Sequence, residues 1–185
     1  TSTPLTTIRA ATTADLDALR GIYNHAVRHT DATLDTEEKT PEQMAAWLAG
    51  HGGRNAAVVA ERDGHVLGYG TLSPFAARGG YFPSTEISVY VAPDAQGMGV
   101  GGALTGWLVD FAREEGYSTI ISFNTDTNVA SIRMIERHGF VRTGLIRHIG
   151  VKLGRLVDLA VTRFSGRTAP EHPGGIPNLP DRVTR

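Results

Sequence analysis

Apolar residues recur at helical spacing in some segments of the chain and form alternating or β-branched runs in others. These runs predict strands over residues 5–10, 56–62, 65–72, 85–91, 117–123, 140–153 and 156–164. Helical spacing predicts one helix after Thr12 or Thr13, one after Thr40, one opening at the glycine-rich residues 96–102, and one over residues 129–138. The expected order is therefore β-α-α-β-β-β-α-β-α-β-β.

Turn and cap residues support the ends of these elements. Residues 40–43, Thr-Pro-Glu-Gln, read as a capping box with proline at the first helical position. Asp63-Gly64 predicts a hairpin turn, and Gly139 predicts a left-handed helix end. Residues 73–84 hold glycine and proline near their middle and end and are expected to form a loop.

The element order predicts a mixed α/β fold with a mostly antiparallel central sheet flanked by helices, because only one βαβ unit follows the antiparallel strands. Residues 1–164 are expected to form one domain. Residues 165–185 contain four of the nine prolines and few large apolar residues. This segment is predicted to be a tail, flexible or draped over the surface.

Charge and composition narrow the classes of partner. Eighteen Lys and Arg against nineteen Asp and Glu give a net charge of -1, so no basic excess serves nucleic-acid phosphates. The chain has no cysteine, which excludes disulfides and thiolate chemistry. No apolar run approaches the roughly 20 residues that span a bilayer, and residues 1–4 lack signal-peptide features. We expect a cytoplasmic protein with neither nucleic acid nor membrane as partner.

The glycine-rich residues 96–102, Gln-Gly-Met-Gly-Val-Gly-Gly, are the most informative segment. Gly97, Gly99 and Gly102 satisfy the dinucleotide pattern G-x-G-x-x-G, but five residues separate Gly97 from the preceding strand, and the upstream hairpin disagrees with parallel winding. A P-loop is excluded because no Lys-Ser/Thr pair follows. A plain tight turn is the remaining structural explanation. Glycines before a helix also expose backbone N–H groups at its positive end, which predicts a pyrophosphate site whatever the rest of the ligand.

Two motifs carry a resemblance to a known family. Gln96-x-x-Gly99-x-Gly101 resembles the acyl-CoA pyrophosphate loop of the GNAT N-acetyltransferases. Asn128-x-x-Ser131, followed by Glu136-Arg137-x-Gly139-Phe140, resembles the next helix and strand start of that superfamily. Residues 73–91, with Ser73-Pro74, Arg78, Tyr81 and the strand from Thr85, are similar to the phosphinothricin acetyltransferase branch, as are Asn24-His25 and residues 33–38. The resemblance covers residues 8–164.

The resemblance implies a GNAT acyl-CoA N-acyltransferase fold and direct acetyl transfer from acetyl-CoA, as cosubstrate, to the primary amine of a small amino-acid-like molecule. Phosphinothricin, methionine sulfone and methionine sulfoximine are the implied substrate type. A homodimer is implied as well, and no metal is expected. A peptide or protein N-acetyltransferase and a non-catalytic acyl-CoA-binding regulator remain as alternatives.

Glu86 is the candidate general base, because an amine must lose a proton before it attacks a thioester and an apolar strand raises a carboxylate's pKa toward a useful range. The resemblance implies the same role. It further implies a set of coenzyme-binding residues on the strand over residues 85–91, in the glycine loop, and at the start of the helix over residues 129–138: Val89, Tyr90, Val91, Gln96, Gly97, Met98, Gly99, Val100, Gly101, Gly102, Asn128 and Ser131.

The substrate pocket is expected around Arg78, a candidate clamp for an anionic group, with Tyr81 and Leu34 beside it and Glu86 at its edge. Two departures from the family pattern stand out. Ile135 occupies a position where relatives carry a Tyr or His that protonates the leaving thiolate, with His138 three residues later. Residues 156–158, Leu-Val-Asp, lack the Trp that relatives usually carry before the Asp. His25 and His29 are predicted to lie on a solvated helix face, and Trp47 and Trp107 in the core.

Overall fold

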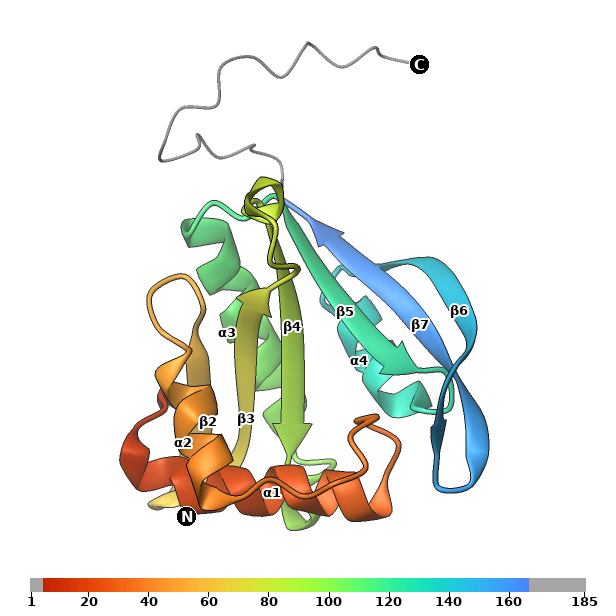
Figure 1. Cartoon of the computed structure of the whole chain (residues 1–185). Helices are drawn as coiled ribbons and strands as arrows, with labels where there is room; N and C mark the ends of the chain where they lie inside the picture. Colours follow the sequence, from red (N-terminus) through yellow and green to blue (C-terminus); the bar gives the residue numbers. More distant parts are fainter. Residues whose placement is uncertain (1–4, 167–185) are drawn as a thin grey trace.

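The computed structural model describes residues 5–166, which form a sheet flanked by helices (Figure 1). Its strands are β1 (Thr7–Ala10), β2 (Ala57–Arg62), β3 (His65–Pro74), β4 (Ser84–Val91), β5 (Thr119–Thr125), β6 (Val141–Lys152) and β7 (Arg155–Ser165). Its helices are α1 (Leu16–His29), α2 (Pro41–Ala49), α3 (Val100–Glu114) and α4 (Val129–Arg137), with short 3-10 turns η1 (Thr13–Asp15), η2 (Gly79–Tyr81) and η3 (Pro93–Ala95). The order of strands and α-helices is the predicted one.

The mixed α/β class is confirmed. The strands form one sheet in the order β1-β2-β3-β4-β5-β7-β6, and every neighbouring pair is antiparallel except β4 and β5. The capping box at Thr40 is present, and Gly139 ends α4 with a φ of 89°. Strand β5 begins at Thr119, two residues later than predicted, because the backbone N–H of Tyr117 still donates to Ala112 in the last turn of α3 while its side chain is buried.

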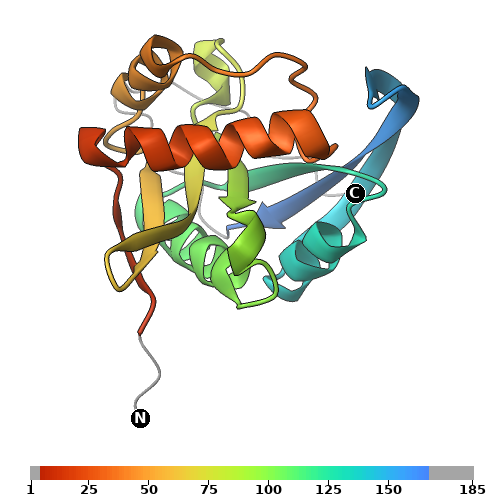
Figure 2. The same cartoon turned by 90° about the horizontal axis from the view of Figure 1, so that it is seen from below.

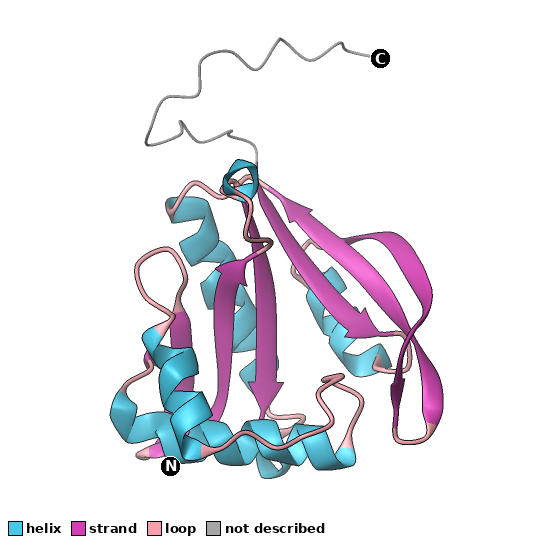
Figure 3. Cartoon of the chain, viewed as in Figure 1, coloured by secondary structure: helices cyan, strands magenta, loops and turns pink. Residues whose placement is uncertain are grey.

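Helices cover both faces of the sheet. Figure 2 shows α1 and α2 on one face and α3 and α4 on the other, and Figure 3 shows the strands between them. Two glycines of β3 let α3 lie close to the sheet. A Cβ at Gly70 would come within 2.7 Å of Leu108 Cδ1, and one at Gly68 within 2.8 Å of the Tyr90 carbonyl oxygen. The close packing of α3 on the sheet therefore depends on the absence of a side chain at Gly68 and Gly70.

Strands β4 and β5 are paired over a short stretch and then part. In the described part of the chain, the pairing runs from Ser84 opposite Thr119 to Glu86 opposite Ile121. Beyond this point the two strands diverge (Figure 1). The facing backbone groups of the two strands then have no ladder between them, so a wedge opens directly after Glu86.

Strand β6 is the outer edge of the sheet and is exposed over most of its length. Residues 141–149 are all exposed. Large apolar side chains, between 41% and 66% exposed, follow β6 into the turn and the start of β7: Val141, Leu145, Ile146, Ile149, Val151, Leu153 and Leu156. Only Ser165 and Gly166 of the predicted tail are described, and Ser165 still belongs to β7; the rest of residues 165–185 lies outside the described residues.

Candidate active site

The glycine-rich segment lies at the start of α3 and lines a groove of about 580 Å³. Gly99 is the N-cap of α3 with a φ of 79°, and Gly97 has a φ of 77°, so both need the left-handed conformation that glycine adopts without strain. A Cβ at either glycine would meet nothing within 4 Å. The floor of the groove is therefore bare backbone, open to a ligand.

The groove suits an anion for two reasons. The first N–H groups of α3 have no partner within the helix, and they lie at the positive end of its dipole. The groove also brings together most of the residues that the sequence assigned to coenzyme binding: Val89, Tyr90, Val91, Gln96, Gly97, Gly99, Val100, Gly101, Gly102, Asn128 and Ser131. Met98 is 47% exposed and does not line it.

The wedge between β4 and β5 continues the groove into the sheet. It is lined by residues 87–90 of β4, residues 122–124 of β5, and Asn128, Ser131 and Ile135 at α4, among others. Unpaired strand backbone on both sides offers hydrogen bonds to an extended chain that carries amide groups. Asn128 caps α4 by accepting a hydrogen bond from the Ser131 backbone N–H at 3.3 Å. Its amide NH2 remains available to the wedge.

Glu86 lies where the wedge begins. It is the last β4 residue paired with β5, and across the sheet it stands opposite Ser73 of β3. Alternation along the strand places its side chain on the same face as Ser88 and Tyr90, towards α1 and α2. Burial raises the pKa of the Glu86 carboxyl above its usual 4.5. A carboxylate held in this way is a stronger base than one in open solvent.

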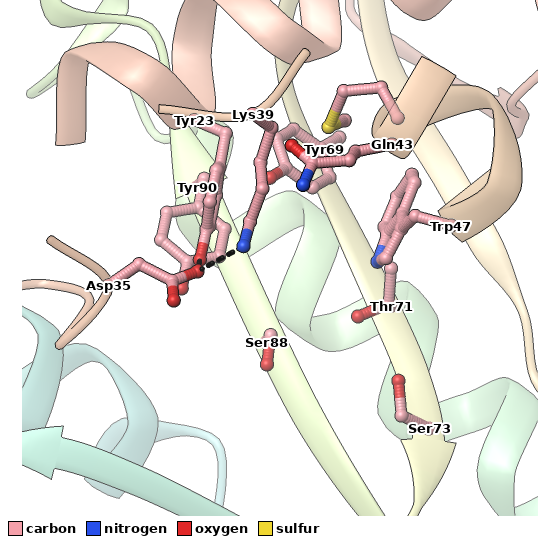
Figure 4. A pocket seen from close by; sticks show the side chains of 11 residues that line it. Tyr23, Asp35, Lys39, Gln43, Trp47, Tyr69, Thr71, Ser73, Ser88 and Tyr90 are labelled. Atoms are coloured by element: carbon pink, nitrogen blue, oxygen red, sulfur yellow. Dashed lines mark hydrogen bonds and ion pairs between the residues drawn. The ribbon is translucent and has the colours of Figure 1, made fainter. Parts of the chain in front are cut away.

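On that face of the sheet lies a cavity of about 470 Å³, which we term the tyrosine pocket (Figure 4). It is lined by α1, α2 and the loop between them, and by β3 and β4: Tyr23, Asp35, Lys39, Gln43, Met44, Trp47, Tyr69, Thr71, Ser73, Ser88 and Tyr90. Its floor pairs Tyr69 with Tyr90 and Thr71 with Ser88 across the two strands. The next pair in this row is Ser73 with Glu86, so the pocket leads to the carboxylate.

A polar network closes the other end of the tyrosine pocket. The Tyr23 hydroxyl donates to Asp35, and Lys39 Nζ lies 3.1 Å from Asp35 Oδ2 (Figure 4). The Tyr23 bond, followed by Lys39, holds the pKa of Asp35 below its usual value. Buried Lys152 donates to the Thr33 carbonyl at 2.6 Å. The loop that carries Asp35 is therefore fixed to the β6–β7 hairpin.

The predicted substrate residues are not gathered in this pocket. Arg78 is exposed at the start of η2, and Tyr81, 42% exposed, packs edge-on against Phe75 at 5.3 Å between ring centroids. Leu34 lies beside Gly150 of β6. The Arg78 guanidinium has neither a hydrogen bond nor an ion pair with another of the described residues 5–166, whereas its backbone carbonyl accepts from the Tyr81 N–H at 3.0 Å. Its loop joins β3 to β4 and so lies at the Glu86 end of the sheet.

Several lining residues were missed by sequence reasoning. Trp47 was predicted to be core and is only half-buried, with one side on the pocket. Lys39 and Asp35 come from a loop without periodicity, which gave no signal. The alternating Tyr69, Thr71 and Ser73 did give one, because hydroxyl side chains on the inward face of a central strand point to a polar cavity.

His25 differs from expectation, and His138 caps the end of α4. His25 is half-buried and lines the groove rather than a bare solvated face, with its ring centroid 4.8 Å from that of His29. His138 Nδ1–H donates to the Met134 carbonyl at 2.9 Å, and its ring packs beside Gly102 and Gly106 of α3. Ile135, not His138, therefore faces the wedge.

Within residues 5–166, no cluster of three or more His, Cys, Asp or Glu side chains is arranged to hold a metal ion. In the same part of the chain, no helix has both the length and the apolar character needed to cross a bilayer.

Comparison with known proteins agrees with this geometry. The model of the acetyltransferase (GNAT) family matches residues 18–140, and a family of unknown function, DUF5996, matches residues 153–185. The chain is 38% identical over 157 residues to the phosphinothricin N-acetyltransferase of Streptomyces coelicolor, covering 83% of this chain and 92% of that one. It is 38% identical over 158 residues to the L-methionine sulfoximine/L-methionine sulfone acetyltransferase of Salmonella typhimurium, covering 83% and 90%.

Among solved structures, a GNAT superfamily phosphinothricin acetyltransferase from Sinorhizobium meliloti in complex with AcCoA superposes with a TM-score of 0.84 at 30% identity, covering 94% of this chain and 93% of that one. The chain therefore belongs to the GNAT acetyltransferase family. It is an N-acetyltransferase that uses acetyl-CoA, and the alternative of a non-catalytic binding protein is set aside.

Proposed function

We propose that this enzyme transfers the acetyl group of acetyl-CoA to the primary amine of a small amino-acid-like substrate, with Glu86 as general base. One observation carries the proposal. Glu86 is the last β4 residue paired with β5, and the wedge and the tyrosine pocket share Ser88 and Tyr90, the next residues on the same face of that strand.

The coenzyme fits the described residues. Backbone N–H groups from Gln96 to Gly102 would hold its diphosphate at the start of α3. A Cβ at Gly101 would come within 3.6 Å of Val91 Cγ2 and 3.7 Å of Met134 Cε, so larger side chains there would fill the groove. Strand residues 89–91 would bind the pantetheine amides from one side, with Asn128 and Ser131 on the other.

The proposed reaction requires the protein to remove one proton from the amine and to polarise the thioester carbonyl. Glu86 accepts a proton from the substrate ammonium, directly or through water, and leaves a nitrogen lone pair that attacks the thioester carbonyl. Backbone N–H groups of residues 89–91 polarise that carbonyl. The transfer is direct, because the chain has no cysteine to carry an acyl group. Ile135 cannot donate a proton to the departing thiolate, so the thiolate leaves without an acid from this position.

The names of the relatives indicate which amines to test as substrates: phosphinothricin, methionine sulfone and methionine sulfoximine, together with common amino acids. Release of free coenzyme A thiol from acetyl-CoA, measured over this panel, tests the proposal. We expect turnover with one or more α-amino acids. Turnover with peptides alone would replace the small-molecule substrate by a peptide N-terminus.

We propose Arg78 as the clamp for the substrate's anionic group, with Tyr81 and Leu34 at the rim. Its guanidinium has no carboxylate partner among residues 5–166 and is free to bind a carboxylate or phosphinate bidentately. Arg78→Ala should raise the KM of an anionic amine by about 10-fold and leave the KM of acetyl-CoA unchanged. Arg113→Ala, an exposed arginine in the last turn of α3, is the control. Equal increases in both KM values would remove Arg78 from this role.

We propose that the enzyme is a homodimer through the exposed apolar surface of β6 and the start of β7. An edge strand with unpaired backbone and a row of exposed apolar side chains is unusual in a monomer. Leu145→Glu should convert the dimer to a monomer in light scattering after size exclusion. Leu5→Glu, at an apolar residue that is 81% exposed outside this surface, should leave it dimeric. A monomeric wild-type protein would contradict the proposal.

We also propose a cytoplasmic location and the absence of nucleic-acid and membrane partners. A cytoplasmic location follows from the cysteine-free composition. The absence of nucleic-acid and membrane partners follows from the balanced charge and from the lack of long apolar runs.

A further inference from the structure

His51 makes two hydrogen bonds that link α2 to the floor of the tyrosine pocket. It follows the end of α2, and its ring lies against Trp47 with centroids 4.7 Å apart. Its Nδ1 is 2.8 Å from the Trp47 carbonyl oxygen, and its Nε2 is 3.2 Å from the Ser73 hydroxyl oxygen. Nothing in the proposed reaction uses this histidine.

The carbonyl fixes the tautomer of the ring. A carbonyl oxygen accepts and never donates, so Nδ1 carries the hydrogen and donates it to Trp47. In the neutral ring Nε2 is then an acceptor, and the Ser73 hydroxyl must donate to it. The lone pairs of Ser73 Oγ are left as acceptors for the pocket. The Thr71 and Ser88 hydroxyls, also on this floor, make no side-chain hydrogen bond to another described residue.

Ser73 is also the floor residue next to the carboxylate. It pairs with Glu86 across β3 and β4, on the face that both strands turn to the pocket. Directly opposed residues of antiparallel strands have Cβ atoms roughly 4.5–5.5 Å apart. A nitrogen that gives one proton to Glu86 therefore lies within reach of Ser73 Oγ. The Ser73 backbone is held as well, because its carbonyl accepts from the Thr85 hydroxyl at 2.9 Å.

We propose that Ser73 binds the acceptor amine through an N–H bond beside Glu86, and that His51 is a positioning residue that keeps the Ser73 hydroxyl turned as an acceptor. The inference rests on the proposed function and extends it. Glu86 takes one hydrogen of the ammonium and Ser73 holds another. The amine is thereby aligned in two directions before it attacks.

Steady-state kinetics of matched variants test this. Ser73→Ala removes the acceptor, and His51→Phe keeps a ring against Trp47 but frees the Ser73 hydroxyl. We expect each to lower kcat/KM for the amine by about 10-fold to 100-fold, with the KM of acetyl-CoA within about twofold of wild type. Ser73→Thr and His51→Gln keep a hydroxyl and an acceptor, respectively, and should recover most of the loss.

The double variant separates positioning from packing. Because His51 acts through Ser73, Ser73→Ala combined with His51→Phe should be no slower than Ser73→Ala alone. His65→Phe is the control, since His65 also bonds a backbone carbonyl, that of Asp63 at 2.9 Å, but lies exposed at the β2–β3 turn. Its kinetics should match wild type.

Additive losses in the double variant, or His51→Phe with unchanged amine kinetics, would overturn the proposal. Equal losses in His51→Gln and His51→Phe would overturn it too, because the acceptor would then be irrelevant. Failure of the proposed function looks different. In that case the wild-type enzyme itself acetylates no amino acid, whatever occupies positions 51 and 73.

Discussion

Replacing Glu86 with glutamine is expected to lower kcat by about 100-fold or more, while acetyl-CoA binds as before. Gln has nearly the shape of Glu but cannot accept a proton near neutral pH, and a positioned general base contributes about 10²–10⁴-fold. The affinity for acetyl-CoA should hold, because the groove at the start of α3 does not include Glu86. Stopped thiol-release assays give kcat, and titration calorimetry gives the affinity.

The pH profile supplies the second half of this test. Burial raises the pKa of Glu86 above 4.5, and only the ionised form acts as a base. The rate of the wild-type enzyme should therefore fall as pH drops through a value higher than that of an exposed carboxylate, and this limb should disappear in Glu86→Gln. Glu115→Gln, at an exposed carboxylate after α3, should keep the wild-type profile. An unchanged acidic limb in Glu86→Gln would assign the proton to another group.

Gly99→Asp is expected to weaken acetyl-CoA binding by about 100-fold or more, close to 3 kcal/mol. Aspartate tolerates the left-handed conformation at Gly99 better than most residues, so the chain should still fold. The same carboxylate, however, would stand in the groove where the coenzyme's diphosphate is proposed to lie, and like charges repel. Thermal unfolding should therefore show a small loss of stability from the strained backbone, and calorimetry should show a much larger loss of coenzyme affinity.

Two further variants isolate the charge. Gly99→Asn has almost the same shape as the aspartate and should lose much less affinity. Gly64→Asp places the same residue at a φ of 76° in the β2–β3 turn, also with open space around it, and should leave binding unchanged. Similar affinities for the Asp and Asn variants at position 99 would mean that the diphosphate lies elsewhere.

Sequence reasoning predicted the fold where a signal repeats along the chain. Periodicity gave the order of strands and helices, and turn chemistry gave the ends at Thr40 and Gly139. It placed the start of β5 two residues early because β-branched and aromatic residues are also found where a buried helix end meets a strand. The coenzyme groove was predicted from the glycine-rich segment and from the family resemblance, because periodicity carries no signal for it.

The tyrosine pocket shows where such reasoning ends. Helical spacing identified the apolar side of Trp47 but not whether that side faces another side chain or a cavity. His51 follows a helix end and contacts Ser73, which is 22 positions away, so no local pattern connects them. Arg78 was singled out by resemblance, yet its exposed place at η2 separates it from the pocket lining.

The short pairing of β4 with β5 divides the sheet into two blocks that share few ladder hydrogen bonds. One block contains β1, β2, β3 and β4, and the other contains β5, β7 and β6. A coenzyme arm bound between β4 and β5 would replace the missing inter-strand hydrogen bonds with its own. The cosubstrate would then also connect the two blocks of the sheet. The enzyme would therefore be most rigid when both reactants are bound.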